Sequence, residues 1–321
     1  MPRMNMPRMR LMHAAILLSA VASINGADLR LGIVGTDTSH AVAFTALLND
    51  ASNPDHLVGA RVVAAYKGGS PDLPESANRV DKYAAELQSK YGVEFVPDIA
   101  TLLTKVDAVL LESVDGRPHL AQFREIVKGR QPVFIDKPLA STLSDAREIA
   151  RLAREAGVPW FTSSALRFSD GLAALKLDGL NGVFVWAPGP LEPHHELDLS
   201  WYGIHGVEML YTLMGTGCKQ VSRISTPDAD LITGRWKDGR LGALRLMRPY
   251  SGYGATAFSP QLIRSSDKDL YTGYRQLVAQ IIKFFQTGKP PVDERETMEM
   301  FEFMDAALRS AKAGGAPAPI R

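Results

Sequence analysis

Residues 31–40, LGIVGTDTSH, constrain the fold of this chain more than any other stretch. An apolar run from Leu29 to Val34 ends at Gly35, and a helix rich in small residues is predicted from Ala41 onward. A strand, a glycine turn and a helix in this order are typical of the opening of a dinucleotide-binding βαβ unit. The chain is therefore predicted to begin with a Rossmann-type parallel sheet.

The same turn departs from the G-x-G-x-x-G fingerprint that such units normally carry. Gly35 holds the first position, but Asp37 stands at the second and His40 at the third. The second glycine normally lets a pyrophosphate approach the backbone, and a carboxylate there repels it. Either the hydroxyls of the turn and the helix N-terminus hold the phosphate instead, or the nucleotide is gone. Those hydroxyls belong to Thr36, Thr38 and Ser39.

Apolar runs alternate with predicted helices over the first half of the chain. The runs after the first strand are 61–66, 108–112, 133–136 and 159–162. This alternation predicts a doubly wound α/β Rossmann domain over residues 28–165. Beyond Arg167 the strands have period two and lack long intervening helices, which predicts an α+β domain over residues 166–321 with an open, mostly antiparallel sheet. The last eight residues, GGAPAPIR, are expected to be flexible.

The end of the predicted second strand bears on the choice of cofactor. An NAD-binding unit places an acidic residue there to hold the ribose hydroxyls, but this chain has Lys67 followed by two glycines. A lysine at this place pairs with the 2′-phosphate of NADP, or it is a solvated loop residue. The sequence leaves NAD and NADP open.

The N-terminal segment has the layout of a secretory signal peptide. Arg3, Arg8 and Arg10 precede an apolar stretch over residues 11–24, and small residues follow near residue 27. This stretch of fourteen residues is shorter than the roughly 20 residues that span a bilayer, so no stable membrane span is expected. We expect residues 1–27 to direct export to the periplasm or medium; if translation starts further downstream, the protein is cytoplasmic. The formal net charge of +1 offers no basic stripe for nucleic acid.

Five short elements follow one another along the chain in an order typical of one family. They are Pro118-His119, Asp136-Lys137-Pro138, Arg167, Gly203-Ile204-His205, and the stretch from Tyr274 to Ser310. Together they resemble the Gfo/Idh/MocA family, named for glucose–fructose oxidoreductase and inositol dehydrogenase, over about residues 29–320. The G-x-D-T-S-H turn resembles a branch of this family whose members also look exported.

The resemblance implies NAD(P)-dependent hydride transfer on a sugar, cyclitol or related polyol. Lys137 would polarise the reacting oxygen and His205 would exchange its proton; a histidine suits this role because its pKa lies near working pH. A lysine ammonium stabilises the developing alkoxide. The implied cofactor contacts are Gly35, Thr36, Asp37, Thr38, Ser39, His40, Lys67 and Asp136.

Two other functions stay open. Some relatives keep their cofactor and cleave glycosides by oxidation, elimination and re-reduction. Alternatively, the chain is a ligand-binding protein on a degenerate Rossmann scaffold, which Asp37, the missing ribose-binding acid and the predicted export favour. A further departure is Trp201, which stands where the family has an aspartate four residues before its histidine. His205 would then be a packed helix-start residue.

Further polar and aromatic residues are predicted to contact a carbohydrate-like substrate. They are Arg117, Arg167, His194, His195, Trp201 and Tyr202. Histidines and acids at 192–208 lack a fixed ligand spacing, so no metal site is predicted. The open sheet predicts a homodimer or homotetramer.

Overall fold

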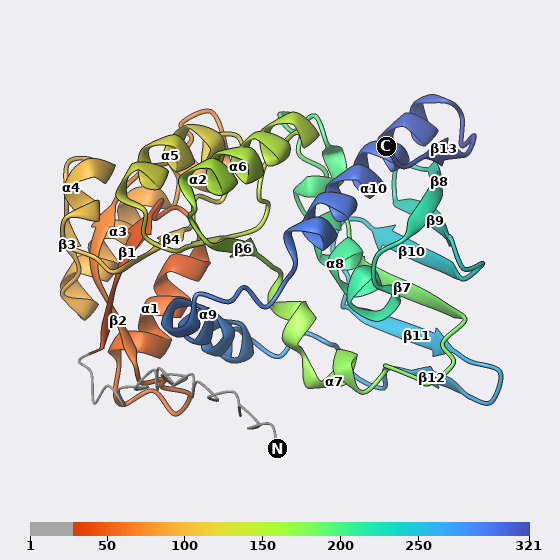
Figure 1. Ribbon diagram of the computed structural model, residues 1–321, viewed down its shortest axis with the longest axis horizontal. Helices are drawn as coiled ribbons and strands as arrows, with labels where there is room; N and C mark the ends of the chain where they lie inside the picture. The colour runs from red at the N-terminus through yellow and green to blue at the C-terminus, as the bar shows by residue number, and fades with distance from the viewer. Residues whose placement is uncertain (1–27) are drawn as a thin grey trace, which may run out of the picture.

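The computed structural model describes residues 28–321, and the predicted signal peptide lies outside the described residues. Two sheets lie side by side, with helices packed on both faces of the first and on one face of the second (Figure 1). Within the described residues, no helix combines the length and the apolar character needed to cross a membrane.

The first sheet is fully parallel, as predicted. Its strands are β1 (Leu29–Val34), β2 (Ala60–Tyr66), β3 (Glu94–Phe95), β4 (Ala108–Leu111), β5 (Val133–Ile135) and β6 (Trp160–Thr162). They are arranged in the order β3-β2-β1-β4-β5-β6. The order reverses between β1 and β4, and ligands of doubly wound sheets bind outside the carboxyl ends of the strands at this switch point.

The helices of the first domain cover both faces of this sheet. They are α1 (Ser39–Asn49), α2 (Pro74–Ala77), α3 (Val80–Tyr91), α4 (Ile99–Leu103), α5 (His119–Ile126), the 3₁₀ turn η1 (Val127–Gly129) and α6 (Leu143–Ala156). The side chain of Thr38 caps α1 by accepting a hydrogen bond from the His40 backbone N–H, at 3.2 Å. Helix α1 therefore begins directly after the glycine turn, with its N-terminus at the carboxyl edge of the sheet.

The second sheet is mostly antiparallel, which confirms the predicted fold class. Its strands are β7 (Gly182–Pro188), β8 (Cys218–Ser225), β9 (Ala229–Trp236), β10 (Leu241–Met247), β11 (Gly254–Phe258), β12 (Ile263–Ser265) and β13 (Ala318–Pro319). The order is β12-β11-β7-β10-β9-β8-β13, and only β7 and β10 pair in parallel.

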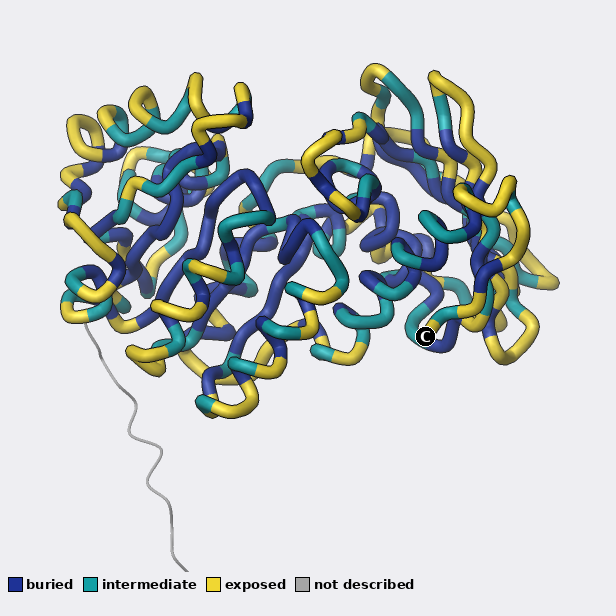
Figure 2. Tube along the Cα trace, turned by 90° about the horizontal axis from the view of Figure 1, so that it is seen from above, coloured by how far each residue is buried: buried dark blue, intermediate teal, exposed yellow. Residues whose placement is uncertain are grey.

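The remaining helices join the two domains. They are η2 (Ala165–Phe168), α7 (Asp170–Ala173), η3 (Asp198–Ser200), α8 (Gly203–Met214), α9 (Arg275–Thr287) and α10 (Glu294–Lys312). Helices α8 and α10 pack on one face of the second sheet, whereas α9 returns to the first domain beside α1 (Figure 1). Buried segments run through the interior of both halves of the molecule (Figure 2). Helix α8 is buried over most of its length.

The C-terminal tail differs from the sequence prediction. It was expected to be flexible, but Ala318 and Pro319 pair with Val221 and Gln220 at the edge of the second sheet. The Arg309 guanidinium also donates a hydrogen bond to the Pro319 carbonyl, at 2.7 Å. The glycine- and proline-rich composition concealed this strand, because an edge strand tolerates proline where a central one does not.

Candidate active site

A cavity of about 430 Å³ lies between the carboxyl edge of the parallel sheet and the second domain. It is lined by Thr38, Ser39, His40, Glu75, Arg79, Val114, Lys137, Ser163, Ser164, Ala165, Leu166, Pro190, Trp201, Tyr202, His205, Tyr250, Tyr253, Tyr271 and Tyr274. Both residues with a predicted catalytic role, Lys137 and His205, are among them. So are Thr38, Ser39, His40, Trp201 and Tyr202.

Lys137 reaches the cavity directly after β5. Its Nζ lies 5.7 Å from the centre of the Tyr202 ring. Burial lowers the pKa of the Lys137 ammonium, and the neighbouring carboxylates of Asp136 and Glu112 oppose that shift. Among residues 28–321 no carboxylate forms an ion pair with Lys137, so its charge is available to a ligand in the cavity.

His205 lies in the first turn of α8, where the chain enters the second domain. Its Nδ1 and the Oγ of Ser164 are 2.7 Å apart. Burial, and then the nearby positive charge of Lys137, hold the pKa of His205 well below its usual value of 6.5. The imidazole is therefore neutral at pH 7 and able to accept a proton.

The glycine turn itself is covered by protein. Thr36 and Asp37 have no exposed surface, and Thr38 is 3% exposed. The carboxylate of Asp37 accepts hydrogen bonds from the Val114 backbone N–H (3.1 Å) and from the Ser76 hydroxyl (2.6 Å). The acid at the second glycine position is thus held inside the protein by two donors.

Residues 67–79, named here the cover segment, lie over this turn. Asp72 forms a bidentate ion pair with Arg117, at 2.7 and 3.0 Å. Leu73 is buried against Val114 and Trp201. The Thr36 backbone N–H donates to the Lys67 carbonyl at the start of the segment, at 2.9 Å. The Lys67 side chain pairs with Asp81 and not with a group in the cavity.

The start of α1 and the second fingerprint position have different surroundings. The cavity is lined by Ser39, Ser163 and Ser164 and by the N-terminus of α1, which is the place where a Rossmann unit holds the pyrophosphate. A Cβ on Gly35 would overlap backbone and side-chain atoms of Ser113, so this glycine serves the packing of β1 against β4. Asp37 and the cover segment therefore occupy the second fingerprint position, whereas Thr38, Ser39 and His40 at the start of α1 line the cavity.

Several predicted substrate contacts lie outside the cavity. Arg117 is bound by Asp72 and Asp115. Arg167 pairs with Glu208 and Glu296. His195 is buried between Asp115 and Ser200, and His194 bonds Glu192 at 2.5 Å. These side chains brace the loops around the cavity.

Sequence reasoning did not single out four tyrosines of the cavity wall. They are Tyr250, Tyr253, Tyr271 and Tyr274. Tyr253 packs edge-on against the His205 ring, with centroids 5.8 Å apart, and Tyr274 lies 4.6 Å from the His40 ring. The repeated spacing of three between tyrosines was the available signal. It was not interpretable for the first three, because no strand was predicted over residues 248–273, and Tyr274 was noted only as the start of a family element.

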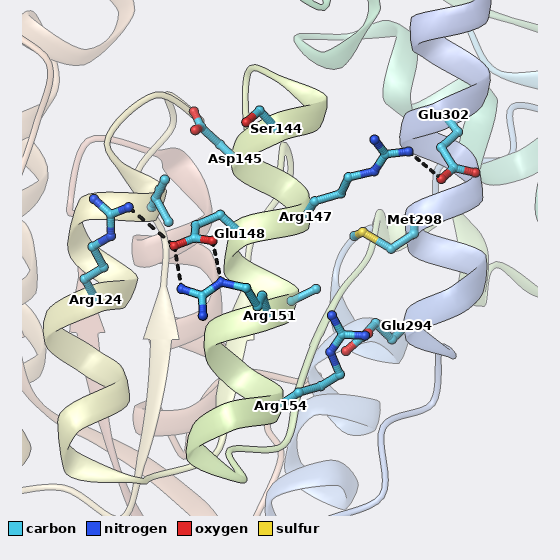
Figure 3. Close-up of a pocket in the computed structure, with 12 residues that line it drawn as sticks. Arg124, Ser144, Asp145, Arg147, Glu148, Arg151, Arg154, Glu294, Met298 and Glu302 are labelled. Atoms are coloured by element: carbon cyan, nitrogen blue, oxygen red, sulfur yellow. Dashed lines mark hydrogen bonds and ion pairs between the residues drawn. The ribbon is translucent and has the colours of Figure 1, made fainter. Parts of the chain in front are cut away.

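In a second hollow, between α6 and α10, each arginine is paired with a carboxylate (Figure 3). Arg147 pairs with Glu302, Arg151 with Glu148, and Arg154 with Glu294. Because each arginine already has a carboxylate partner, this groove is not a site for an anionic ligand.

The parallel sheet, its switch point and the cavity with a lysine and a histidine define a two-domain Rossmann oxidoreductase fold. Residues 29–163 match the family model described as "Oxidoreductase family, NAD-binding Rossmann fold". The resemblance to the Gfo/Idh/MocA family is thereby confirmed for this domain. The predicted cofactor class, NAD or NADP, is confirmed as that of the family fold. The comparison with curated proteins gives no match.

Solved structures share the whole two-domain fold. A probable dehydrogenase from Thermotoga maritima is 20% identical, with a TM-score of 0.73 over 91% of this chain and 99% of its own. Myo-inositol dehydrogenase from Lactobacillus casei, solved with NAD(H) and myo-inositol, is 18% identical, with a TM-score of 0.72 over 92% and 97%. Myo-inositol 2-dehydrogenase from Lactobacillus plantarum is 13% identical, with a TM-score of 0.74 over 92% and 100%. At these identities the likeness establishes the fold alone.

Proposed function

We propose that the protein is an NAD(P)-dependent oxidoreductase that acts on a sugar, cyclitol or related polyol. The observation that carries the proposal is that Lys137 and His205, from different domains, line the same cavity. The family is consistent with a sugar or polyol oxidoreductase, and the Lactobacillus casei neighbour was solved with NAD(H) and myo-inositol.

The two residues divide the proton chemistry of such a reaction. A bound nicotinamide supplies hydride acceptance and donation. The Lys137 ammonium stabilises negative charge on the oxygen as the hydroxyl ionises. The neutral His205 imidazole takes the hydroxyl proton during oxidation and returns it during reduction.

The cavity wall suits a polyhydroxylated ligand. Tyrosine and tryptophan rings present apolar faces to the C–H groups of a sugar, while Ser163 and Ser164 offer hydroxyls. The cavity volume of about 430 Å³ lies within the range of small-molecule sites. A polyol of monosaccharide size is the substrate class that follows.

Nucleotide binding is the decisive test of this proposal. The purified protein is denatured and any released nucleotide is identified by mass, and NAD(H) and NADP(H) are titrated calorimetrically. We expect one nucleotide per chain, and nicotinamide reduction when inositols or aldoses are added. Absence of binding by all four nucleotide forms contradicts the proposal. Cleavage of glycosides without added cofactor, with the nucleotide retained, supports the glycoside-cleaving alternative.

A second candidate function is ligand binding without a nucleotide. The buried Asp37 and the closed cover segment favour it, because a dinucleotide needs the surface that they occupy. This function predicts calorimetric binding of a polyol to the nucleotide-free protein and no nucleotide binding. Replacing Asp72 by asparagine loosens the cover segment and distinguishes the two: nucleotide affinity rises only if the segment gates an existing site.

The pH dependence of kcat/KM tests the role of His205. Because the pKa of His205 is lowered, its neutral form persists as the pH falls. The decrease of kcat/KM on the acid side of the pH profile, here called the acid limb, is therefore expected below pH 6.5. The titratable groups that face it are Lys137, His40, Tyr202 and Tyr253. Replacing Lys137 by methionine removes a positive charge and moves the limb upward, towards pH 6.5. An acid limb that stays in a His205→Asn variant contradicts this assignment.

The open face of the second sheet supports a homodimer. Leu231 and Leu241 are 39% and 62% exposed on the face opposite α8. A second copy covers this face isologously and buries the apolar side chains. We expect light scattering to give a dimer and a Leu231→Lys/Leu241→Lys variant to be monomeric. Val58→Lys, at a 78% exposed position of the first domain, is the matched control. A monomeric unaltered protein contradicts the proposal.

We also propose that the protein is exported, on the composition of residues 1–27. Fusion of these residues to a reporter that is active only outside the cytoplasm is expected to give activity. An inactive reporter, with the fusion protein found in the cytoplasm, overturns the proposal.

A further inference from the structure

Three buried side chains converge beneath the cavity, at the carboxyl ends of three neighbouring strands. Glu112 directly follows β4, Asp136 directly follows β5, and His40 lies in the first turn of α1 after β1. These strands flank the switch point of the parallel sheet, where folds of this type bind their ligands. One of the three residues, His40, stands where the G-x-G-x-x-G fingerprint has its third glycine.

Their donor atoms lie close enough to share one ion. The His40 Nδ1 and the Asp136 Oδ2 are 2.7 Å apart. One ligand atom from each of His40, Glu112 and Asp136 lies within 4.8 Å of the others. Ligand bonds of about 2.0–2.2 Å from nitrogen and oxygen can be formed around a central ion after small side-chain movements.

The cluster has unsatisfied acceptors, which distinguishes it from an ordinary buried ion pair. Both carboxylate oxygens of Glu112 and the Oδ1 of Asp136 have no hydrogen-bond partner in the described part of the chain. Glu112 is 0% exposed and Asp136 is 1% exposed. A buried carboxylate without a donor is strongly unfavourable, so a cation or a proton is needed there.

We propose that His40, Glu112 and Asp136 bind a divalent transition-metal ion. One imidazole nitrogen and two carboxylates form a mixed N/O ligand set that suits Zn²⁺ or Mn²⁺. The His40 ring also lines the cavity, so the ion lies next to the substrate pocket and Lys137. The sequence predicted no metal site, because the ligands come from distant segments: His40 and Asp136 are 96 residues apart in the chain.

A second His–Asp pair in the protein has hydrogen-bond partners for its polar side-chain atoms and serves as a comparison. His195 Nε2 lies 3.0 Å from Asp115 Oδ1, and its Nδ1 lies 2.9 Å from the Ser200 hydroxyl. Asp115 also accepts hydrogen bonds from Arg117. Every group there has a partner, whereas Glu112 has none. The His195–Asp115 pair is therefore structural, whereas the cluster of His40, Glu112 and Asp136 has acceptor atoms free to bind an ion.

The test measures metal binding without nucleotide or substrate, so its result is independent of the proposed activity. Protein stripped with a chelator is titrated calorimetrically with Zn²⁺ and, separately, Mn²⁺. We expect one ion per chain with a Kd in the micromolar range or tighter, and an increase in Tm on binding. Elemental analysis of protein purified without chelator is expected to show the same stoichiometry.

Substitutions locate the ion. Glu112→Gln preserves the shape of the side chain, and His40→Asn and Asp136→Asn remove the other ligands; each is expected to weaken binding about 100-fold or more. Near-UV circular dichroism verifies that each variant is folded. The control is His194→Asn, which breaks the His194–Glu192 pair outside the cavity and leaves the affinity unchanged. No binding by the unaltered protein, or equal binding by Glu112→Gln, overturns the proposal and leaves Glu112 as a protonated acid.

Discussion

Replacement of Lys137 by methionine is expected to lower kcat for polyol oxidation by about 100- to 1,000-fold, the usual effect of removing one electrostatic contact to a developing oxyanion. Methionine keeps the length and apolar stem of the side chain but has no charge. Because Lys137 acts on the charge that develops in the reaction, KM is expected to change much less than kcat. Steady-state kinetics of the unaltered protein and of Lys137→Met give kcat and KM for the comparison.

Lys128→Met is the matched control for this prediction. Lys128 is an exposed lysine in η1, directly after α5, and it pairs with Glu125. Its replacement is expected to leave kcat and KM unchanged. If Lys137→Met retains full kcat, Lys137 does not stabilise the reacting oxygen. If only KM rises, Lys137 binds the substrate without acting on the reacting oxygen.

Replacement of Gly35 by alanine is expected to destabilise the protein by about 3 kcal/mol or more, because strained backbone and steric overlap act together. Gly35 has φ +89°, and its Cβ would overlap the backbone N and Cα of Ser113 at the end of β4. Neither strand can move without disturbing the centre of the parallel sheet. Chemical denaturation measures the free energy of unfolding.

A second glycine separates the two contributions. Gly92 ends α3 with φ +67°, and a Cβ there meets nothing within 4 Å. Gly92→Ala is therefore expected to cost only about 1–2 kcal/mol, the penalty for the left-handed backbone alone. Equal effects of the two substitutions would mean that the contact between β1 and β4 does not constrain Gly35.

The sequence predicted the architecture because secondary structure is encoded locally. Strand β1, Gly35 and α1 follow from an apolar run, a turn residue and a helix start that are adjacent in the chain. The change from buried runs to period-two strands after Arg167 likewise predicted the second sheet. The C-terminal strand β13 was missed, because an edge pairing depends on the neighbouring β8 and not on its own composition.

The candidate site was only partly predictable. Lys137 and His205 were found through family motifs, and the structure places both in one cavity. Arg167 was expected at the substrate but lies between Glu208 and Glu296, a pairing that no local pattern reveals. The cavity tyrosines were missed because they lie on loops whose course depends on the strands around them.

The glycine turn illustrates which features of this protein the sequence predicts and which depend on tertiary contacts. By itself the sequence determined that this is a strand–turn–helix unit with an altered fingerprint, since those features reside in ten consecutive residues. Only the tertiary structure decided the surroundings of the altered residues. Asp37 faces Ser76 and Val114, and His40 faces Asp136. The physical reason is that parallel strands joined by helical crossovers bring their carboxyl ends together from distant segments, so these contacts depend on the packing of the whole sheet.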